Sequence, residues 1–268
     1  MGHFSGSLVQ RETRTFALLD QIVTVLGGTK LTFLPILSGF GTELFPYGTG
    51  NDAPVGTASA ALESVFDPMQ HVGGVHSIYN DSSASANVQF VDDADQSFAG
   101  AGGMSMGLWI MPTEALGTAR TFISKYDATG ASEVREYYFS MDTSGNLILD
   151  LWDETNNGNE KGTGASDVIV PWVWNFVVAT YDGTAATPAV HLYRNAVDTL
   201  SAGTTTETGT FADMVDGAAK CAIGAEIRAA SVENEFEGRI ALPFLCGKEL
   251  TSANVTTLFG LGKTLLGT

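Results

Sequence analysis

Cysteine is scarce in this sequence, which has only Cys221 and Cys246 among 268 residues. Two cysteines cannot form the disulfide framework that small secreted domains need, and one bridge is the most they could supply. No feature of the sequence requires that bridge. We therefore predict that both thiols are free and buried.

Positive charge is also scarce. The chain has 13 Lys and Arg residues against 30 Asp and Glu residues, which gives a formal net charge of -17. Such a chain repels phosphate backbones and anionic lipid head groups, so we exclude nucleic acid as a partner. Solubility is the simplest reason for the acidity, and cation binding or docking on a basic surface is the alternative.

Long apolar runs are missing as well. The apolar stretch at residues 16–26 includes Asp20 and Gln21, and it is shorter than the roughly 20 residues that a membrane span needs. It also lacks the uninterrupted core and the small-residue cleavage site of a secretory signal. We therefore predict no membrane insertion and no signal peptide.

Motifs of common catalytic sites do not occur. There is no Gly-x-Ser-x-Gly elbow, phosphate loop or dinucleotide fingerprint. The four histidines, His3, His71, His76 and His191, lack the close spacing of a zinc site. We predict that the protein is not an enzyme.

What the sequence does contain is typical of an all-β protein. It has 31 glycines, 44% hydrophobic residues and only 16% charged residues, which suits many short strands joined by turns around a buried core. Alternation of apolar and polar residues predicts strands at 75–79, 86–91, 104–111, 120–126, 136–141, 147–153, 173–181, 189–194, 220–227 and 235–244.

Local signals refine this pattern. Both faces of the strand at 104–111 are apolar, which predicts a central strand. A short glycine-containing loop at 142–146 predicts a hairpin between its neighbours. Residues 58–66 suggest a short helical turn closed by Pro68. One helix is predicted near the end, capped by Thr251 or Ser252 and stopped by Gly260.

The first 60 residues differ from the rest, because apolar bursts alternate there with glycine-rich turns. Such a segment cannot cover its own apolar surface. We predict an N-terminal extension at 1–60 and one domain at 61–268. The extension packs on that domain or on another subunit, or it supplies ordinary strands of the sandwich.

An ordered series of segments resembles the laminin-G-like, concanavalin A-like and pentraxin jelly-roll family. The segments are NVQFVDDA at 87–94, MSMGLWIMP at 104–112, FISKYD at 122–127, GNL at 145–147, VWNFVVATYDG at 173–183, HLYR at 191–194, AIG at 222–224, FEGRI at 236–240 and ELTS at 249–252. The resemblance covers residues 70–263 and implies a two-sheet antiparallel jelly-roll sandwich that buries Trp109 and Trp174 between its sheets.

Two departures from the family pattern bear on function. Arg194, Asn195 and Ala196 stand where the family usually has an Asp-Gly turn, and residues 241–244 stand where an acidic pair is common. The resemblance therefore does not carry over ligand or calcium binding at those positions.

Candidate ligand-binding residues are Trp152, Trp172, Asp150 and Glu154. Asp150, Trp152 and Glu154 alternate along one strand and share a face, where the indole could stack on a sugar. Core or edge packing is the alternative for Trp152. Trp172 could serve as a similar platform on a loop or sheet.

Two acidic groups are candidates for other chemistry. Asp92, Asp93 and Asp95 could offer oxygen ligands to calcium, although an acidic turn without metal is the simpler explanation. The glutamates at 233, 235 and 237 would share one face of a strand, as the acid and nucleophile of a glycosidase do. A solvated edge strand is the stronger alternative.

These observations give three functional hypotheses. The first is a structural protein of an assembled particle, such as a phage virion component used for capsid decoration or in the tail, with protein partners and a homo-oligomeric state. It would place the protein in a virion or cell-surface assembly. The second is a carbohydrate-binding or adhesion module, and a glycoside hydrolase ranks third. No cofactor is predicted, calcium excepted.

Overall fold

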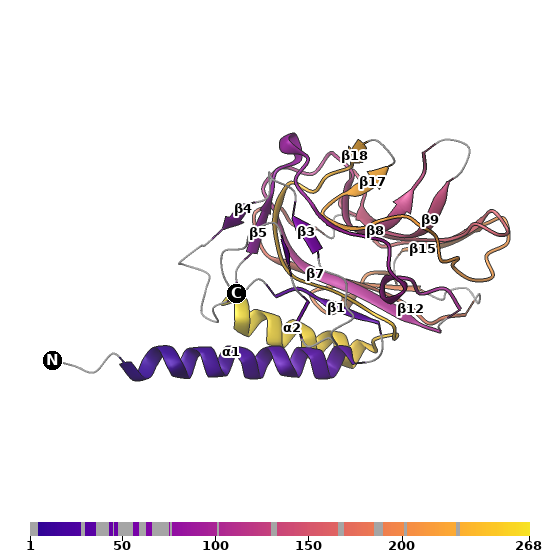
Figure 1. Cartoon of the computed structure of the whole chain (residues 1–268). Helices are drawn as coiled ribbons and strands as arrows, with labels where there is room; N and C mark the ends of the chain where they lie inside the picture. The colour runs from indigo at the N-terminus through magenta and orange to yellow at the C-terminus, as the bar shows by residue number, and fades with distance from the viewer. Residues whose placement is uncertain are drawn as a thin grey trace.

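The structure is a computed structural model of the whole chain. It describes residues 5–27, 30–35, 43–44, 46–47, 56–58, 63–65, 75, 77–100, 102–129, 133–165, 169–184, 190–200, 203–228 and 231–268. Within these residues two large antiparallel sheets stack face to face as a jelly-roll sandwich, with two helices beneath them (Figure 1).

The first sheet has eight strands in the described part of the chain. Its order is β14 (Val197–Asp198), β13 (Val190–Arg194), β12 (Asn175–Tyr181), β7 (Met104–Pro112), β19 (Gly238–Cys246), β5 (Ser77–Asn80) and β4 (Glu63–Val65), and β1 (Leu31–Phe33) also pairs with β19. Since β7 lies between β12 and β19, the prediction of a central strand is confirmed.

The second sheet has nine strands in the same described residues. Its order is β15 (Thr204–Thr208), β11 (Gly158–Thr163), β10 (Leu147–Asp153), β9 (Val134–Met141), β8 (Arg120–Asp127), β16 (Cys221–Ile223), β6 (Val88–Phe90), β3 (Gly56–Ala58) and β2 (Glu43–Leu44). The predicted hairpin of β9 and β10 is present. A separate hairpin of β17 (Glu226–Arg228) and β18 (Ser231–Glu233) lies against β8.

The main core lies between the two sheets. Alternate residues of β7, including Met106, Leu108 and Ile110, face this core and are fully buried, as are Phe122 and Phe139 of the second sheet. Burying apolar side chains on both inner faces is the main stabilising contribution in such a sandwich.

The other face of the first sheet is covered by helices. Helix α1 (Ser5–Leu26) and helix α2 (Ser252–Leu266) lie side by side under this sheet (Figure 1). Trp109 is buried here, stacked on Phe259 and tilted against Phe176, and Trp174 is half-buried against the same cluster. The prediction that these two indoles lie between the sheets is therefore wrong, because odd-numbered residues of β7 point to the helices.

Helix α2 begins as predicted, with Thr251 as its N-cap in a capping box with Asn254. It does not stop at Gly260 but continues to Leu266, and Gly267 closes it in the left-handed conformation. Glycine is required at position 262 inside this helix, because a Cβ there would lie 2.2 Å from Trp109 Nε1.

Helix α1 is not among the predicted elements. Its buried residues Thr15, Leu19, Ile22 and Leu26 recur at helical spacing, and they pack on β1, β19 and α2. In the described residues no helix is long and apolar enough to cross a membrane.

The segment before residue 60 contributes to both sheets. Strand β1 pairs with β19, and β2 and β3 extend the second sheet beyond β6, which agrees with the interpretation that this segment supplies sandwich strands. The helical turn predicted for residues 58–66 is wrong in its described part, since β3 ends at Ala58 and β4 occupies 63–65.

Candidate functional site

Trp152, Asp150 and Glu154 lie together on the outer face of the second sheet. They come from β10 and the turn that follows it, and each is half-buried. The guanidinium carbon of Arg135 lies 3.5 Å from the centre of the Trp152 ring, and Arg135 Nε donates to Glu154 Oε1 at 2.5 Å. One face of the indole is therefore occupied by a cation of the same chain.

The charged groups around Trp152 are also satisfied internally. Asn159 Nδ2 donates to Asp150 Oδ1 at 2.7 Å. Burial raises the pKa of Asp150 while that amide opposes the rise. Burial lowers the pKa of Arg135, but its contacts with Glu154 and Glu133 raise it above its usual value. This cluster uses its own residues as partners and leaves little for a ligand.

Trp172, in contrast to Trp152, lies open to solvent. It lies in the loop before β12, its side chain is 64% exposed, and its backbone has a φ of 66°. A bulky residue in this left-handed region costs roughly 1–2 kcal/mol, and such outliers concentrate at functional positions. Val170 and Val173 in the same loop are 41% and 46% exposed, so the loop displays apolar surface to solvent.

The side chain of Asn175 holds this loop in place by hydrogen bonds. Its side chain is fully buried, and its Nδ2 donates to the carbonyls of Val170 and Val173 at 2.8 Å each. The amide of Val170 donates to Asn175 Oδ1 at 3.2 Å, and the amide of Trp172 donates to the carbonyl of Pro112 at 2.8 Å. The loop is held by hydrogen bonds to buried groups, so the backbone that carries the exposed indole is held in place.

Arg194 reaches the same place from β13. Its Nε donates to Asn175 Oδ1 at 3.0 Å, and its side chain is half-buried. Burial lowers the pKa of its guanidinium. The site formed by Val170, Trp172, Val173, Asn175 and Arg194 is called the Trp172 site below.

The acidic turn predicted as a calcium site has other partners. Asp92 Oδ1 forms an ion pair with Lys125 Nζ at 3.1 Å. Asp93 Oδ1 accepts a hydrogen bond from the amide of Asp95 at 2.9 Å and caps the 3₁₀ helix Ala94–Gln96. The described residues hold no group of three His, Cys, Asp or Glu side chains arranged to bind a metal ion. Calcium binding by Asp92, Asp93 and Asp95 stays a prediction.

Lys125 forms a buried ionic cluster. Its side chain is fully buried, and Nζ contacts Glu136 Oε2 at 3.0 Å, Asp216 Oδ1 at 3.2 Å and the carbonyl of Gly217. Burial lowers the pKa of Lys125, and the surrounding carboxylates reverse this and raise it. An ammonium thus stands among the oxygens next to Asp92.

The row of glutamates does not form. Only Glu233 lies on a strand, Asn234 has a φ of 51°, and residues 235–237 are irregular. Burial raises the pKa of Glu237, but hydrogen bonds from Tyr79 and Ser82 hold it below its usual value. The expectation of three carboxylates on one strand face is wrong, because the chain leaves the extended conformation after Glu233.

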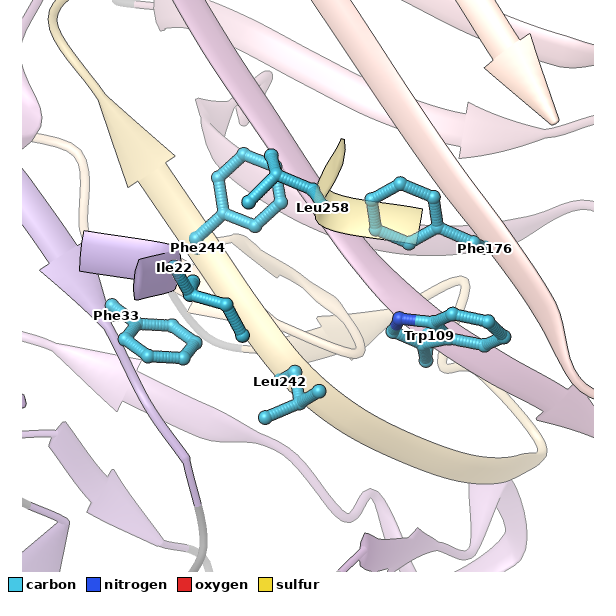
Figure 2. Close-up of a pocket in the computed structure, with 7 residues that line it drawn as sticks. All are labelled: Ile22, Phe33, Trp109, Phe176, Leu242, Phe244 and Leu258. Atoms are coloured by element: carbon cyan, nitrogen blue, oxygen red, sulfur yellow. The ribbon is translucent and has the colours of Figure 1, made fainter. Parts of the chain in front are cut away.

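A small cavity lies under the first sheet, between it and the helices (Figure 2). It is about 10 Å³ in volume and is lined by Ile22, Phe33, Trp109, Phe176, Leu242, Phe244 and Leu258. An apolar space of this size is at the lower limit for a single water molecule. It is a packing gap and not a ligand site.

Other predicted residues have structural roles. Cys221 and Cys246 are free and buried, as predicted, and burial raises the pKa of each to about 12. His191 Nδ1 lies 3.1 Å from Asp198 Oδ2. The remaining three histidines are outside the described residues. The sequence predicts neither the ionic cluster of Lys125 nor the contact of Arg194 with Asn175.

Comparison with known proteins gives a family and a set of similar folds. The family model of the concanavalin A-like lectin/glucanase superfamily matches residues 82–256, more than half of the chain. A comparison with curated proteins gives no match.

Similar solved structures include binding domains of toxins and a sialidase. The binding domain of Paraclostridial mosquitocidal protein 1 is 11% identical, with a TM-score of 0.58 over 85% of this chain and 52% of that one. Botulinum neurotoxin type C, whose cell entry depends on two ganglioside molecules, is 12% identical, with a TM-score of 0.57 over 85% of this chain and 51% of that one. Trypanosoma rangeli sialidase in complex with sialic acid is 13% identical, with a TM-score of 0.58 over 97% of this chain and 40% of that one.

This chain therefore spans about half or less of the length of these structures. At such low identity the likeness shows the shared fold. A fold of this kind hosts both binding domains and glycosidases.

Proposed function

The chain belongs to the concanavalin A-like lectin/glucanase superfamily, and from this premise we propose that it is a non-catalytic module that binds a glycan at the Trp172 site. The observation that carries this proposal is the exposed, left-handed Trp172 on a loop fixed by buried Asn175. A flat aromatic ring at the surface can stack on the apolar face of a sugar, and a loop that is already fixed loses little conformational entropy when the sugar binds.

Binding partners of the similar structures point in the same direction. One of them enters cells through ganglioside molecules, and another holds sialic acid. Both are properties of those proteins, and they support a sugar as the class of ligand for this chain.

We propose a non-catalytic role because of the surroundings of Glu235 and Glu237. A glycosidase needs a carboxylic acid whose pKa is raised, close to a second carboxylate. Glu237 has its pKa held below the usual value by two donors, and Glu235 accepts a hydrogen bond from Ser85 at 3.1 Å. These groups serve the packing of the loop at 81–85.

A glycan array with native protein and three variants tests the proposal. Trp172→Ala should reduce retention at least tenfold, because the stacking surface is lost, while Trp172→Phe should keep most of it. Val91→Ser is a matched control, since this residue is 69% exposed and follows β6 of the second sheet. Retention unchanged in Trp172→Ala, or no retention of native protein on any glycan, contradicts the proposal.

A second proposal is that the chain is a structural component of an assembled particle, such as a phage virion, and can carry out glycan binding there. Its support is helix α1, whose first turns extend beyond the body of the sandwich (Figure 1). Among the described side chains of this helix, the buried ones run from Thr15 to Leu26.

Deletion of residues 1–13 distinguishes this role from that of an isolated module. The variant should fold with native circular dichroism, since it keeps the α1 residues that are described as buried, yet lose co-sedimentation with large particles. Deletion of 1–60 is unsuitable because it removes β1, β2 and β3. Normal assembly of the shortened chain would count against the particle role.

A further inference from the structure

Arg194 has no acidic partner among the residues that the structure describes. It is the last residue of β13, on the inner side of the sheet with Val190 and Leu192, at the end of the sandwich where the Trp172 loop lies. Its one side-chain hydrogen bond in the described part of the chain runs from Nε to Asn175 Oδ1. No carboxylate among the described residues forms an ion pair with it.

Three other half-buried or buried arginines among the described residues form ion pairs. Arg120 contacts Glu114, Arg135 contacts Glu154 and Glu133, and Arg228 contacts Glu226. With 30 acidic residues against 13 basic ones, carboxylates are abundant. A partly desolvated guanidinium without one retains its capacity for an external anion.

Its remaining donors suit a carboxylate. Binding Asn175 uses Nε and leaves the two terminal nitrogens, whose planar arrangement matches the two oxygens of a carboxylate. Trp172 and Asn175 are three residues apart, so their Cα atoms are within about 11 Å of each other. Because Arg194 Nε lies 3.0 Å from Asn175 Oδ1, the guanidinium adjoins the loop that carries the indole.

We infer that the ligand of the Trp172 site carries a carboxylate, as sialic and uronic acids do, and that Arg194 binds it. This inference rests on the proposed function. The negative charge of the whole chain does not prevent it, because at physiological ionic strength charges farther away than about 8 Å are largely screened.

Matched pairs of ligands separate the sugar from its charge. We would measure calorimetric affinities for sialyllactose and lactose, and for a galacturonate trimer and its neutral methyl ester. Native protein should bind at least one acidic member tenfold or more tightly than its neutral partner, and that preference should weaken in 1 M salt. The pair that shows the preference identifies which acid is recognised.

Variants then test whether Arg194 causes the preference for the acidic ligand. Arg194→Gln should bind acidic and neutral members equally, with the neutral affinity unchanged, and Arg194→Lys should keep part of the preference as a point charge. Arg14→Gln, an exposed arginine on α1, is the control for net charge. Trp172→Ala should weaken both members of a pair.

Two results would overturn the inference. Equal native affinity for acidic and neutral members, with both lost in Trp172→Ala, leaves the glycan site standing and removes the carboxylate. Loss of neutral binding in Arg194→Gln would show that the arginine only positions the loop through Asn175.

Discussion

Trp152 and Trp172 offer the same chemical group to two different regions of the molecule. On the second sheet, the Trp152 ring is covered by Arg135, which in turn is held by Glu154 and Glu133. At the end of the sandwich, the Trp172 ring is 64% exposed, and the nearby Arg194 has no carboxylate in the described residues.

The difference shows how internal pairing separates structural from binding positions. A charged or aromatic group that finds its partner within the chain stabilises the fold, and its removal should lower the free energy of unfolding. A group that the fold holds in place without a partner contributes little to stability and remains available to a ligand. Variants of the second sheet should therefore lose stability, and variants of the Trp172 site should lose binding.

The largest loss of stability is expected for Lys125→Met. The change leaves Glu136, whose side chain is 1% exposed, without its cation, and breaking a buried ion pair on one side costs about 3–5 kcal/mol. Urea unfolding measures this loss. The control is Lys220→Met on the surface, where Nζ contacts only Gln89 at 3.3 Å among the described residues; equal stability of the two variants would contradict the internal role of Lys125.

A smaller loss is expected for Arg135→Met. The guanidinium makes two contacts with Glu154 and one with Glu133, and its side chain is 8% exposed. Removing it should cost about 2 kcal/mol and uncover the Trp152 ring, which acrylamide quenching of tryptophan fluorescence would detect. Arg14→Met, at an exposed position on α1, should cost less. Quenching that stays at the native level would show that Arg135 does not cover the indole.

Asp153 should make the second sheet sensitive to acid. Burial raises its pKa, but donors from Asn156 and Ala212 hold the pKa below the usual value of 3.8. A lowered pKa contributes stability that is present above about pH 4 and is lost as the pH falls through the folded value. Asp153→Asn should cost about 1–2 kcal/mol at pH 7, and the gap from native protein should shrink towards pH 2.5 in urea titrations. A gap that is constant with pH would contradict this account.

The sequence predicts much of the fold because many of its signals are local. The hairpin of β9 and β10, the two apolar faces of β7 and the Thr251 cap each depend on a few adjacent residues, and all are confirmed. Helix α1 has helical spacing, but β-branched residues such as Thr13, Thr15 and Thr24 weaken its propensity. Its stability comes from packing on the sheet and on α2, which no local pattern reveals.

The candidate site is only half predictable for a related reason. Trp152 and Trp172 are equal candidates in the sequence, and what distinguishes them is whether Arg135 or solvent covers the ring. Arg194 meets Asn175 across the β12–β13 pairing, 19 residues away in the chain. Such contacts depend on strand order and register, which are properties of the complete fold.

The smallest effect on stability, and the clearest separation of the two regions, is expected for Trp172→Gly. Glycine adopts a φ of 66° without penalty, which recovers roughly 1–2 kcal/mol of backbone strain, while its greater freedom in the unfolded chain costs about 0.5–1 kcal/mol. The exposed ring contributes little burial, so the variant should be as stable as native protein or up to about 1 kcal/mol more stable. Trp172→Ala keeps the strained backbone and should be the less stable of the two, yet both should lose glycan retention. A substantial loss of stability in Trp172→Gly would mean that the indole supports the fold, and it would place Trp172 in the same class as Trp152.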